Sequence, residues 1–474
     1  MSSANAELRS SLAQVEASMS SLQYTKRSLL RQLNATTSTG CLILANLSRE
    51  ITSEIFLYCL GPFPSYPGST ANPRHLPMLL LHVCRTWRSI ALATPGLWTN
   101  LNLEFDRIPQ TLFDGGNLEK FIGDCVARTA NLPLSLHLVA GYRRREEAGR
   151  LIPAILQQLS SRIQVLDLSV LIEHFPENAA GFPRLRSLVV KFGYEHDLAR
   201  IAGKPIRTFA TAPQLRQVEM YCRAAPSQFV IPWMNVVVFH IEEVSSKECA
   251  DVLRAAPSLI ECTFGDLQLD PDTLAVSHPG LKSLTCSVDP FLQYLTLPAL
   301  QRLELPYSDG GEAHLPPFLS RSSASLLKFT LTDSHPPPLA AFSSMLALTD
   351  LTLFDPSSAY LTEFFGLFDR TKNSHFLPQL QALKLDSCSP YVNTALVDAL
   401  TSRCAAAPDG GAQLRSFRQS WPVHGIAPDA LQGYYRDQGF GAALEELVEN
   451  GLEVYIGHQD ANRNPGGWLF SAAR

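Results

Sequence analysis

The sequence lacks the features that would point to a membrane, to secretion or to nucleic acid. No apolar run approaches the roughly 20 residues that a membrane-spanning helix needs, and the richest short one is Met78–Val83. The first seven residues are polar and do not have the basic and apolar segments of a signal peptide. The formal net charge is -5, so there is no basic excess of the kind that binds phosphate backbones. We therefore expect a protein of the cytoplasm, the nucleus or both, without membrane or nucleic-acid partners.

Motifs for metal binding and catalysis are also missing. The ten cysteines form no CxxC pair and are spread along the chain, whereas a zinc site needs ligands close together. We predict buried, reduced thiols. The twelve histidines have no partnered nucleophile motif, and GxSxG, GxxxxGK[ST] and HExxH are absent. We assign no catalytic residue, no metal and no cofactor, and expect a protein that is not an enzyme.

Residues 1–40 are predicted to form a helix with a heptad rhythm. Apolar residues recur at steps of four and three from Leu8 to Leu33, with Lys26 as the one polar interruption. This stretch is near the lower limit for recognising a coiled coil. A single amphipathic helix is a nearly equal alternative, so the segment is an amphipathic or coiled-coil-like helix.

Residues 41–104 have the pattern of a small all-α domain. Ser48 can cap a helix over Arg49–Leu60, because a serine oxygen accepts from the free backbone N–H groups of the first turn. Five prolines predict a loop over Gly61–Pro77. A second helix is predicted over Met78–Ala93, and the residues after it are expected to pack back on the domain.

An internal repeat, Pro-x-Leu-x-x-Leu-x-Leu with substitutions, dominates residues 105–457. Pro298–Leu305 and Pro378–Leu385 are clear copies, and Pro232/Met234/Val237/Phe239 is a degenerate one. The copies start about 19 to 34 residues apart, around the leucine-rich-repeat period of roughly 20–29. The last two apolar residues lie two apart and so point to one side of a short strand, and the segments between strands look helical. Stacked copies can bury a face that one copy cannot.

The fold class predicted from these patterns is α/β (mixed). It consists of an N-terminal helix, a small all-α domain and a leucine-rich-repeat-like α/β solenoid with a parallel sheet. We expect Pro306–Pro317 to be a loop inserted between repeats. Residues 458–474 are predicted to be a polar tail.

Two segments of the helical domain resemble the F-box of proteins that are abundant in mushroom-forming fungi. Ile43–Leu60 reads ILANLSREITSEIFLYCL, and Leu76–Leu103 reads LPMLLLHVCRTWRSIALATPGLWTNLNL. That family has a Leu-Pro-Pro-Glu-Ile start, a Val-Cys-Arg-x-Trp-Arg helix and a Thr-Pro-x-Leu-Trp finish. Irregular leucine-rich repeats usually follow. Ser48 stands where the family has proline.

The resemblance implies a partner and a docking surface. The family's F-box docks a Skp-type adaptor, which joins it to a cullin–RING ubiquitin ligase. Both Trp87 and Trp98 are expected to serve the core and the interface together. Carried over by position, the docking residues are Leu47, Ile51, Ile55, Val83, Cys84, Trp87, Leu97 and Trp98.

The repeat region is expected to bind a protein substrate through its strands. Residues that flank the apolar pair of each strand point away from the core, because strand side chains alternate. Their mixture of both charges with aromatic side chains is typical of a surface for a protein or peptide and not for a polyanion. The candidates are Tyr221, Arg302, Glu304, Lys328, Asp350, Phe354 and Lys384. Any solenoid has a polar exposed face, so an inert face is the alternative.

These features favour the substrate-recognition adaptor of a Skp–cullin–F-box ubiquitin ligase. The alternative is a non-catalytic repeat scaffold for protein–protein interaction without ligase association. An enzyme hidden in the repeat region is a distant third.

Overall fold

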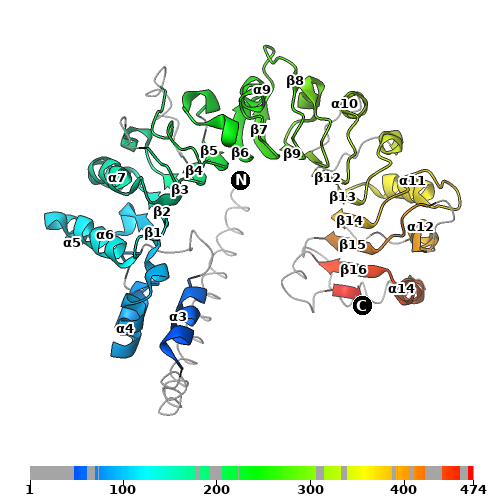
Figure 1. The fold of residues 1–474 in the computed structure, drawn as a ribbon. Coiled ribbons are helices and arrows are strands. Elements are labelled where there is room, and N and C mark those ends of the chain that lie inside the picture. The colour runs from blue at the N-terminus through cyan, green and yellow to red at the C-terminus, as the bar shows by residue number, and fades with distance from the viewer. Residues whose placement is uncertain are drawn as a thin grey trace, which may run out of the picture. The chain divides into compact units, whose positions relative to one another are not determined.

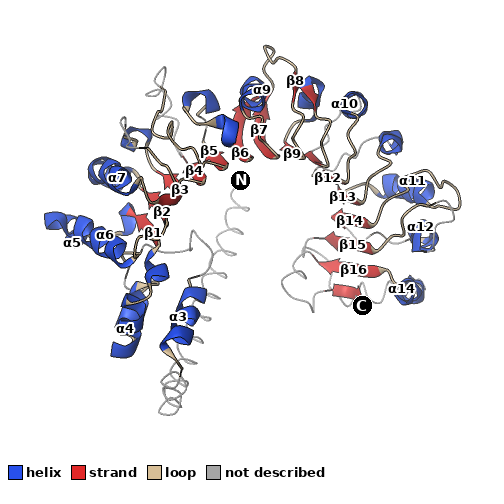
Figure 2. Ribbon diagram, viewed as in Figure 1, coloured by secondary structure: helices blue, strands red, loops and turns tan. Residues whose placement is uncertain are grey.

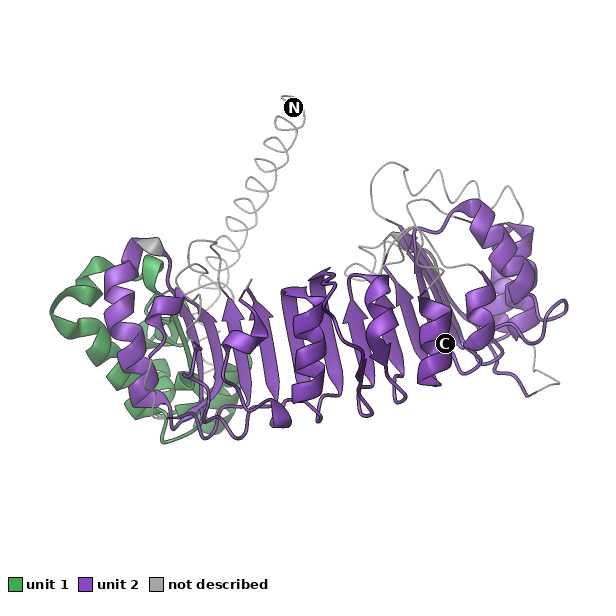
Figure 3. Ribbon diagram, turned by 90° about the horizontal axis from the view of Figure 1, so that it is seen from above, with its two compact units in different colours: residues 1–132 green, residues 133–474 purple. Residues whose placement is uncertain are grey.

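We describe a computed structural model of the 474-residue chain. The described residues are 47–60, 70–72, 74–176, 181–191, 205–222, 224–305, 314–332, 339–386, 391, 393–404, 410–421, 440–458 and 468–472. The fold is mixed α/β with a large parallel sheet and several helices, as the sequence predicted. The chain divides into two compact units, residues 1–132 and 133–474 (Figure 3). The predicted N-terminal helix over 1–40 lies outside the described residues.

Unit 1 is built mainly from short helices. Its elements are α3 (Arg49–Tyr58), a 3₁₀ turn (Met78–His82), α4 (Arg85–Leu92), a second 3₁₀ turn (Pro95–Trp98), β1 (Asn100–Glu104), α5 (Gln110–Phe113) and α6 (Asn117–Arg128). Ser48 caps α3 as predicted, since its side chain accepts a hydrogen bond of 3.3 Å from the backbone N–H of Ile51.

The single helix predicted over Met78–Ala93 is wrong. The structure has a 3₁₀ turn that ends at His82 and a separate helix, α4, that begins at Arg85. Cys84 between them is extended, and its thiol accepts a hydrogen bond of 3.4 Å from the backbone N–H of Trp87. The chain therefore restarts a helix here with Cys84 as the cap, which the continuous apolar pattern did not reveal.

The strands of unit 2 follow one another across the sheet in chain order (Figure 1). Each neighbouring pair from β2 to β16 is parallel. The strands are β2 (Leu134–Val139), β3 (Ile163–Ser169), β4 (Ser187–Lys191), β5 (Gln217–Tyr221), β6 (Val238–Ser245), β7 (Glu261–Gln268), β9 (Ser283–Cys286), β11 (Arg302–Leu305), β12 (Lys328–Leu331), β13 (Asp350–Phe354), β14 (Ala382–Asp386), β15 (Ser416–Trp421) and β16 (Glu453–His458). A separate parallel pair joins β8 (Val276–Ser277) to β10 (Leu295–Thr296).

The C-terminal part of the chain differs from the predicted polar tail over 458–474. Residues Trp468–Ala472 form β17, which pairs antiparallel with β16. The polar composition of the segment before it hid this strand.

The apolar positions of the repeat unit are the buried ones. Leu284, Leu303, Phe329 and Leu351 stand in register on successive strands and are at most 1% exposed. Side-chain alternation places them all on one side of the sheet. This shared row is the core of unit 2.

The degenerate copy was assigned two residues too early. Met234 is 66% exposed in a 3₁₀ turn, and Val218 of β5 pairs with Phe239. The buried pair on β6 is therefore Phe239 and Ile241. Compared with the other copies, this one has two additional residues between its proline and its strand, and they lie in the 3₁₀ turn Trp233–Asn235.

Helices cover one side of the sheet in unit 2, and no helix of its described part covers the strand face opposite (Figures 1 and 2). They are α7 (Arg145–Leu159), α9 (Ser246–Ala255), α10 (Leu315–Ser322), α11 (Ser358–Phe368), α12 (Thr394–Cys404) and α14 (Phe440–Glu449). The loop predicted to continue to Pro317 instead ends in α10, whose first turn holds Pro316 and Pro317. Prolines are tolerated there because the first N–H groups of a helix need no helical partner.

Candidate functional site

The described part of unit 1 exposes seven large apolar side chains, and five of them come from α3 and from the 3₁₀ turn before α4 with the residue that follows it. We call these five the unit-1 apolar surface: Ile51, Ile55, Tyr58, Leu79 and Val83. The first three lie on one face of α3 at positions i, i+4 and i+7. Ile51 is 51%, Ile55 41% and Val83 53% exposed. Apolar side chains gathered on one small unit are typical of a surface that another molecule covers.

Another face of α3 packs against the rest of unit 1, which holds the helix and its exposed side chains in place. Thr52 and Phe56 are buried, and the ring of Phe56 lies 4.9 Å from that of Trp87 on α4. Arg49 donates a hydrogen bond of 2.7 Å to the Ser89 hydroxyl. These contacts hold α3 and α4 together.

Six of the eight predicted docking residues are accessible. Leu47 and Trp87 are half-buried, and Ile51, Ile55, Val83 and Cys84 are exposed.

The other two, Leu97 and Trp98, have no exposed area, so placing them on a docking surface is wrong. The indole N–H of Trp98 donates to the Ala91 carbonyl at 2.9 Å, and the Arg128 guanidinium lies 4.7 Å from the ring centre. Both residues belong to the core of unit 1.

Two exposed residues of the unit-1 apolar surface, Tyr58 and Leu79, were not predicted from the sequence. Tyr58 is 91% exposed. It could have been found from helical spacing, because it lies seven residues after Ile51 on α3.

The cysteines are mostly, but not all, buried. Of the eight described, Cys59 and Cys84 are exposed, which corrects the expectation of burial for these two. Burial raises the pKa of Cys125 to about 12, so this thiol stays protonated and unreactive at neutral pH. The described residues contain no group of three or more His, Cys, Asp or Glu that could hold a metal ion.

The strand face of unit 2 brings several predicted substrate residues into register. Arg302, Lys328 and Asp350 are paired neighbours across β11, β12 and β13. Two residues further along these strands, a second row crosses the sheet from β11 to β14. It consists of Glu304, Thr330, Thr352 and Lys384. The rows therefore place charges of both signs side by side.

Two of these cations are ion-paired within the sheet. The Arg302 guanidinium lies 3.3 Å from the Glu261 carboxylate, and the Lys384 ammonium donates to Asp386. Lys328 is exposed, and no ion pair is found for it among the described residues. Phe354 is also exposed, at the last position of β13.

Tyr221 does not join this group. Four strand spacings separate β5 from β11, which is roughly 19 Å at about 4.8 Å per strand. Its hydroxyl donates to Glu219 at 3.1 Å, and its ring centre lies 4.8 Å from that of His240. Burial and the charge of Glu219 raise the pKa of Tyr221 to about 12.

Tyr221 instead borders a polar group that was not predicted, formed by His137, Asp167 and Lys191 on β2, β3 and β4. The Asp167 carboxylate lies 3.1 Å from the His137 ring and 3.0 Å from the Lys191 ammonium. Burial acts to raise the pKa of Asp167, but the contacts with His137 and Lys191 outweigh it and leave the pKa lowered. Asp167 is therefore a buried anion held by its neighbours. The one signal in the sequence is an acid between two leucines of a strand.

Within the described residues, no helix combines the length and the apolar character that crossing a bilayer requires. No family model matches the chain, and no curated protein matches it in sequence.

Proposed function

We propose that the chain is a substrate-recognition adaptor of a Skp–cullin–F-box ubiquitin ligase. In this proposal residues 41–104 are the F-box and dock a Skp-type adaptor. Residues 105–457 form a leucine-rich-repeat-like solenoid that binds a protein substrate. The protein acts by binding, without a catalytic step of its own, and works in the cytoplasm, the nucleus or both.

The observation that carries this proposal is the unit-1 apolar surface. Fully burying a side chain of the size of isoleucine contributes about 1.5–3 kcal/mol relative to leaving it in water. Several such side chains on a small helical unit, with a packed face behind them, favour docking against another protein. The resemblance to the fungal F-box supplies the identity of that partner.

The strand face of unit 2 supports the second half of the proposal. It carries rows of paired strands with both charges, and Phe354 stands exposed at the end of β13. A protein or peptide offers both complementary charges and apolar contacts to such a face, whereas a polyanion would meet Asp350 and Glu304 unfavourably.

Binding of the full chain to a purified Skp-type adaptor tests the proposal. We expect Ile55→Ala and Val83→Ala each to weaken binding by about 1–2 kcal/mol, the scale of an interface contact. Both residues are exposed in the free protein, so the melting temperature should change little. Calorimetric titration measures the affinity.

Leu132→Ala is the matched control, because Leu132 is another exposed leucine-sized side chain of unit 1 outside this surface. It should bind like the wild type. If the folded wild-type chain has no affinity for the adaptor, the ligase role is refuted and the repeat scaffold becomes the better interpretation.

A further inference from the structure

Four side chains of β5 and β6 are joined by contacts on the strand face of unit 2, and we call them the Tyr221 patch: Glu219, Tyr221, His240 and Glu242. Glu219 is the pairing partner of His240. The Tyr221 hydroxyl donates to Glu219 at 3.1 Å, and the Tyr221 ring lies 4.8 Å from that of His240. His240 Nε2 lies 3.2 Å from the Glu242 carboxylate.

The packing of the sheet fixes the direction of these side chains. Met220 lies between the two patch residues of β5, and Ile241 lies between those of β6. Both have no exposed area and point into the core. Alternation along the strands therefore directs the patch to the other face, which no helix of the described part of unit 2 covers (Figure 2). Tyr221 and Glu242 are exposed there, so a ligand can reach the patch.

The patch carries two negative charges that the chain leaves without a strong cation. Among the described residues, no lysine or arginine is in ion-pair contact with Glu219 or Glu242. Glu219 accepts a hydrogen bond of 2.7 Å from Gln217, which is neutral. Glu261 on the next strand differs, because its carboxylate lies 3.3 Å from the Arg302 guanidinium.

The electrostatic field at the Tyr221 hydroxyl is negative. Burial, then Glu219 and then the charges of Glu242 and Asp167 raise the pKa of Tyr221 to about 12. Lys191 lies 3.0 Å from Asp167, but the Oδ1 atom of Asp167 is buried and has no hydrogen-bond partner within the described part of the chain. Such a field favours a cation, because charges interact more strongly where water is partly excluded.

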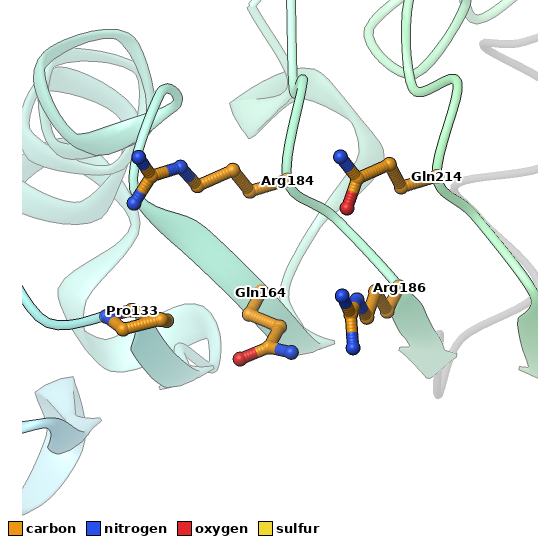
Figure 4. A pocket seen from close by; sticks show the side chains of 5 residues that line it. All are labelled: Pro133, Gln164, Arg184, Arg186 and Gln214. Carbon is orange, nitrogen blue, oxygen red and sulfur yellow. The ribbon is translucent and has the colours of Figure 1, made fainter.

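The beginnings of the neighbouring strands carry the opposite charge. Figure 4 shows Arg184 and Arg186 at the hollow where β3, β4 and β5 begin. A cationic group is repelled there and attracted at the Tyr221 patch, which includes the last residue of β5. The charges therefore determine at which end of these strands a cationic group of a ligand binds.

We infer that the Tyr221 patch binds an arginine side chain of the protein substrate. A guanidinium group has five N–H donors and no acceptor, and the patch offers it two carboxylates and the Tyr221 oxygen. Glu219 and Glu242 are diagonal neighbours on paired strands, with Cα atoms about 7–8 Å apart, so one planar guanidinium between them can donate to both. A lysine ammonium is a compact point charge and spans this gap less well.

This inference rests on the second half of the proposed function, that the strand face of unit 2 binds a protein substrate. Selection of a random peptide library on the full chain provides a ligand for the test. We expect arginine to be enriched in the selected peptides. One selected peptide is then titrated calorimetrically, and again with its arginine replaced by citrulline, an uncharged analogue of nearly the same shape. Citrulline should weaken binding at least tenfold, and lysine should give an affinity between the two.

Glu219→Gln with Glu242→Gln removes both carboxylates of the patch. This double variant should bind the arginine peptide at least tenfold more weakly and the citrulline peptide as the wild type does, because only the contact of the arginine with the carboxylates is lost. Its melting temperature should not fall, since two neighbouring like charges are removed. Glu363→Gln with Glu445→Gln is the matched control. It removes two exposed acids on α11 and α14 and should bind both peptides like the wild type.

The possible failures can be told apart. Equal affinity for the arginine and citrulline peptides, or a Glu219/Glu242 glutamine variant that binds the arginine peptide like the wild type, overturns the inference and leaves the proposed function standing. Enrichment of no peptide contradicts peptide binding by the strand face and the inference with it. Titration with the Skp-type adaptor tests the first half of the proposed function separately, and the double variant should bind the adaptor like the wild type.

Discussion

Gly265 in β7 lies against the backbone of β6. A Cβ atom at this position would come 2.5 Å from the carbonyl oxygen and 2.9 Å from the Cα of Glu242. Backbone atoms of a paired strand cannot move aside as a flexible side chain can. We therefore expect Gly265→Ala to lower the free energy of unfolding by about 1–3 kcal/mol. Urea denaturation measures the change.

Gly366→Ala in α11 is the matched control, because a Cβ there meets nothing within 4 Å. It should leave the free energy of unfolding unchanged or raise it by up to about 1 kcal/mol, since alanine is the better helix former. Equal stabilities of the Gly265→Ala variant and the wild type would show that β6 and β7 can separate locally at little cost.

The lowered pKa of Asp167 predicts that the free energy of unfolding decreases at acidic pH. Its pKa is lower in the folded protein than the ordinary value of about 3.9. The folded state therefore binds fewer protons than the unfolded state as the pH falls through this range. The stabilisation is complete above the unfolded pKa and is lost as the pH falls through the folded pKa.

Asp167→Asn removes this titrating group. We expect the free energy of unfolding of this variant to fall less than that of the wild type between pH 6 and about pH 3. Chemical denaturation across the pH series measures both curves. If the free energies of unfolding of the variant and the wild type change with pH in the same way, Asp167 does not cause the loss of stability at low pH.

At the scale of one helix, the start of α3 depends on Ser48. With a φ of -60° and a ψ of 157°, the Ser48 side chain lies over the first turn of the helix and accepts a hydrogen bond from the backbone N–H of Ile51. Ser48→Ala should destabilise unit 1 by about 1 kcal/mol, because that N–H loses its partner. Ser48→Asp keeps an acceptor and should retain most of the stability. Thermal unfolding followed by circular dichroism compares them, and an unaffected Ser48→Ala variant would mean that solvent replaces the cap.

The strands show how far a repeat pattern determines elements. Copies such as Pro298–Leu305 place β11 correctly, because stacking requires the same apolar spacing in every neighbour. β2 has no proline in this position and was missed, although Leu134, Leu136 and Leu138 alternate and are buried. A search for the repeat motif finds only strands that carry the motif. A strand without it, such as β2, is found only from the alternation of apolar and polar residues along the chain.

The candidate sites were harder to predict than the strands. Ile51, Ile55 and Val83 came from the resemblance and are exposed, whereas Trp98 is buried. Aromatic residues suit both cores and interfaces, so residue type could not separate the two roles. The polar group of His137, Asp167 and Lys191 joins three strands, and its members become neighbours only when the register of the strands is known.

For the whole molecule, adaptor docking and substrate capture are expected to be separable. Changing Arg302, Lys328 and Lys384 together to glutamine should reduce substrate capture at least tenfold, because three cations of the strand face are lost. Affinity for the Skp-type adaptor should stay the same. The measurement is affinity capture under proteasome inhibition, combined with titration of the adaptor.

Neutralising these residues is preferable to reversing their charges. Arg302 lies 3.3 Å from Glu261, so a negative charge there would repel its present partner and disturb the sheet. Lys120, Lys247 and Lys282, all exposed, changed together to glutamine give a control with the same loss of charge. Capture that survives the Arg302, Lys328 and Lys384 changes would place the substrate elsewhere on the chain.

The antiparallel strand β17 has a consequence for self-association. A stack of parallel strands repeats the same hydrogen-bonding row, so an open last strand could accept the first strand of another molecule and lengthen into a fibre. On β16 that row is already taken, since Val454, Tyr455 and Ile456 pair with β17 in the opposite direction. The last parallel strand is thus covered by a strand of opposite direction from the same chain, and these five residues help to keep each molecule separate.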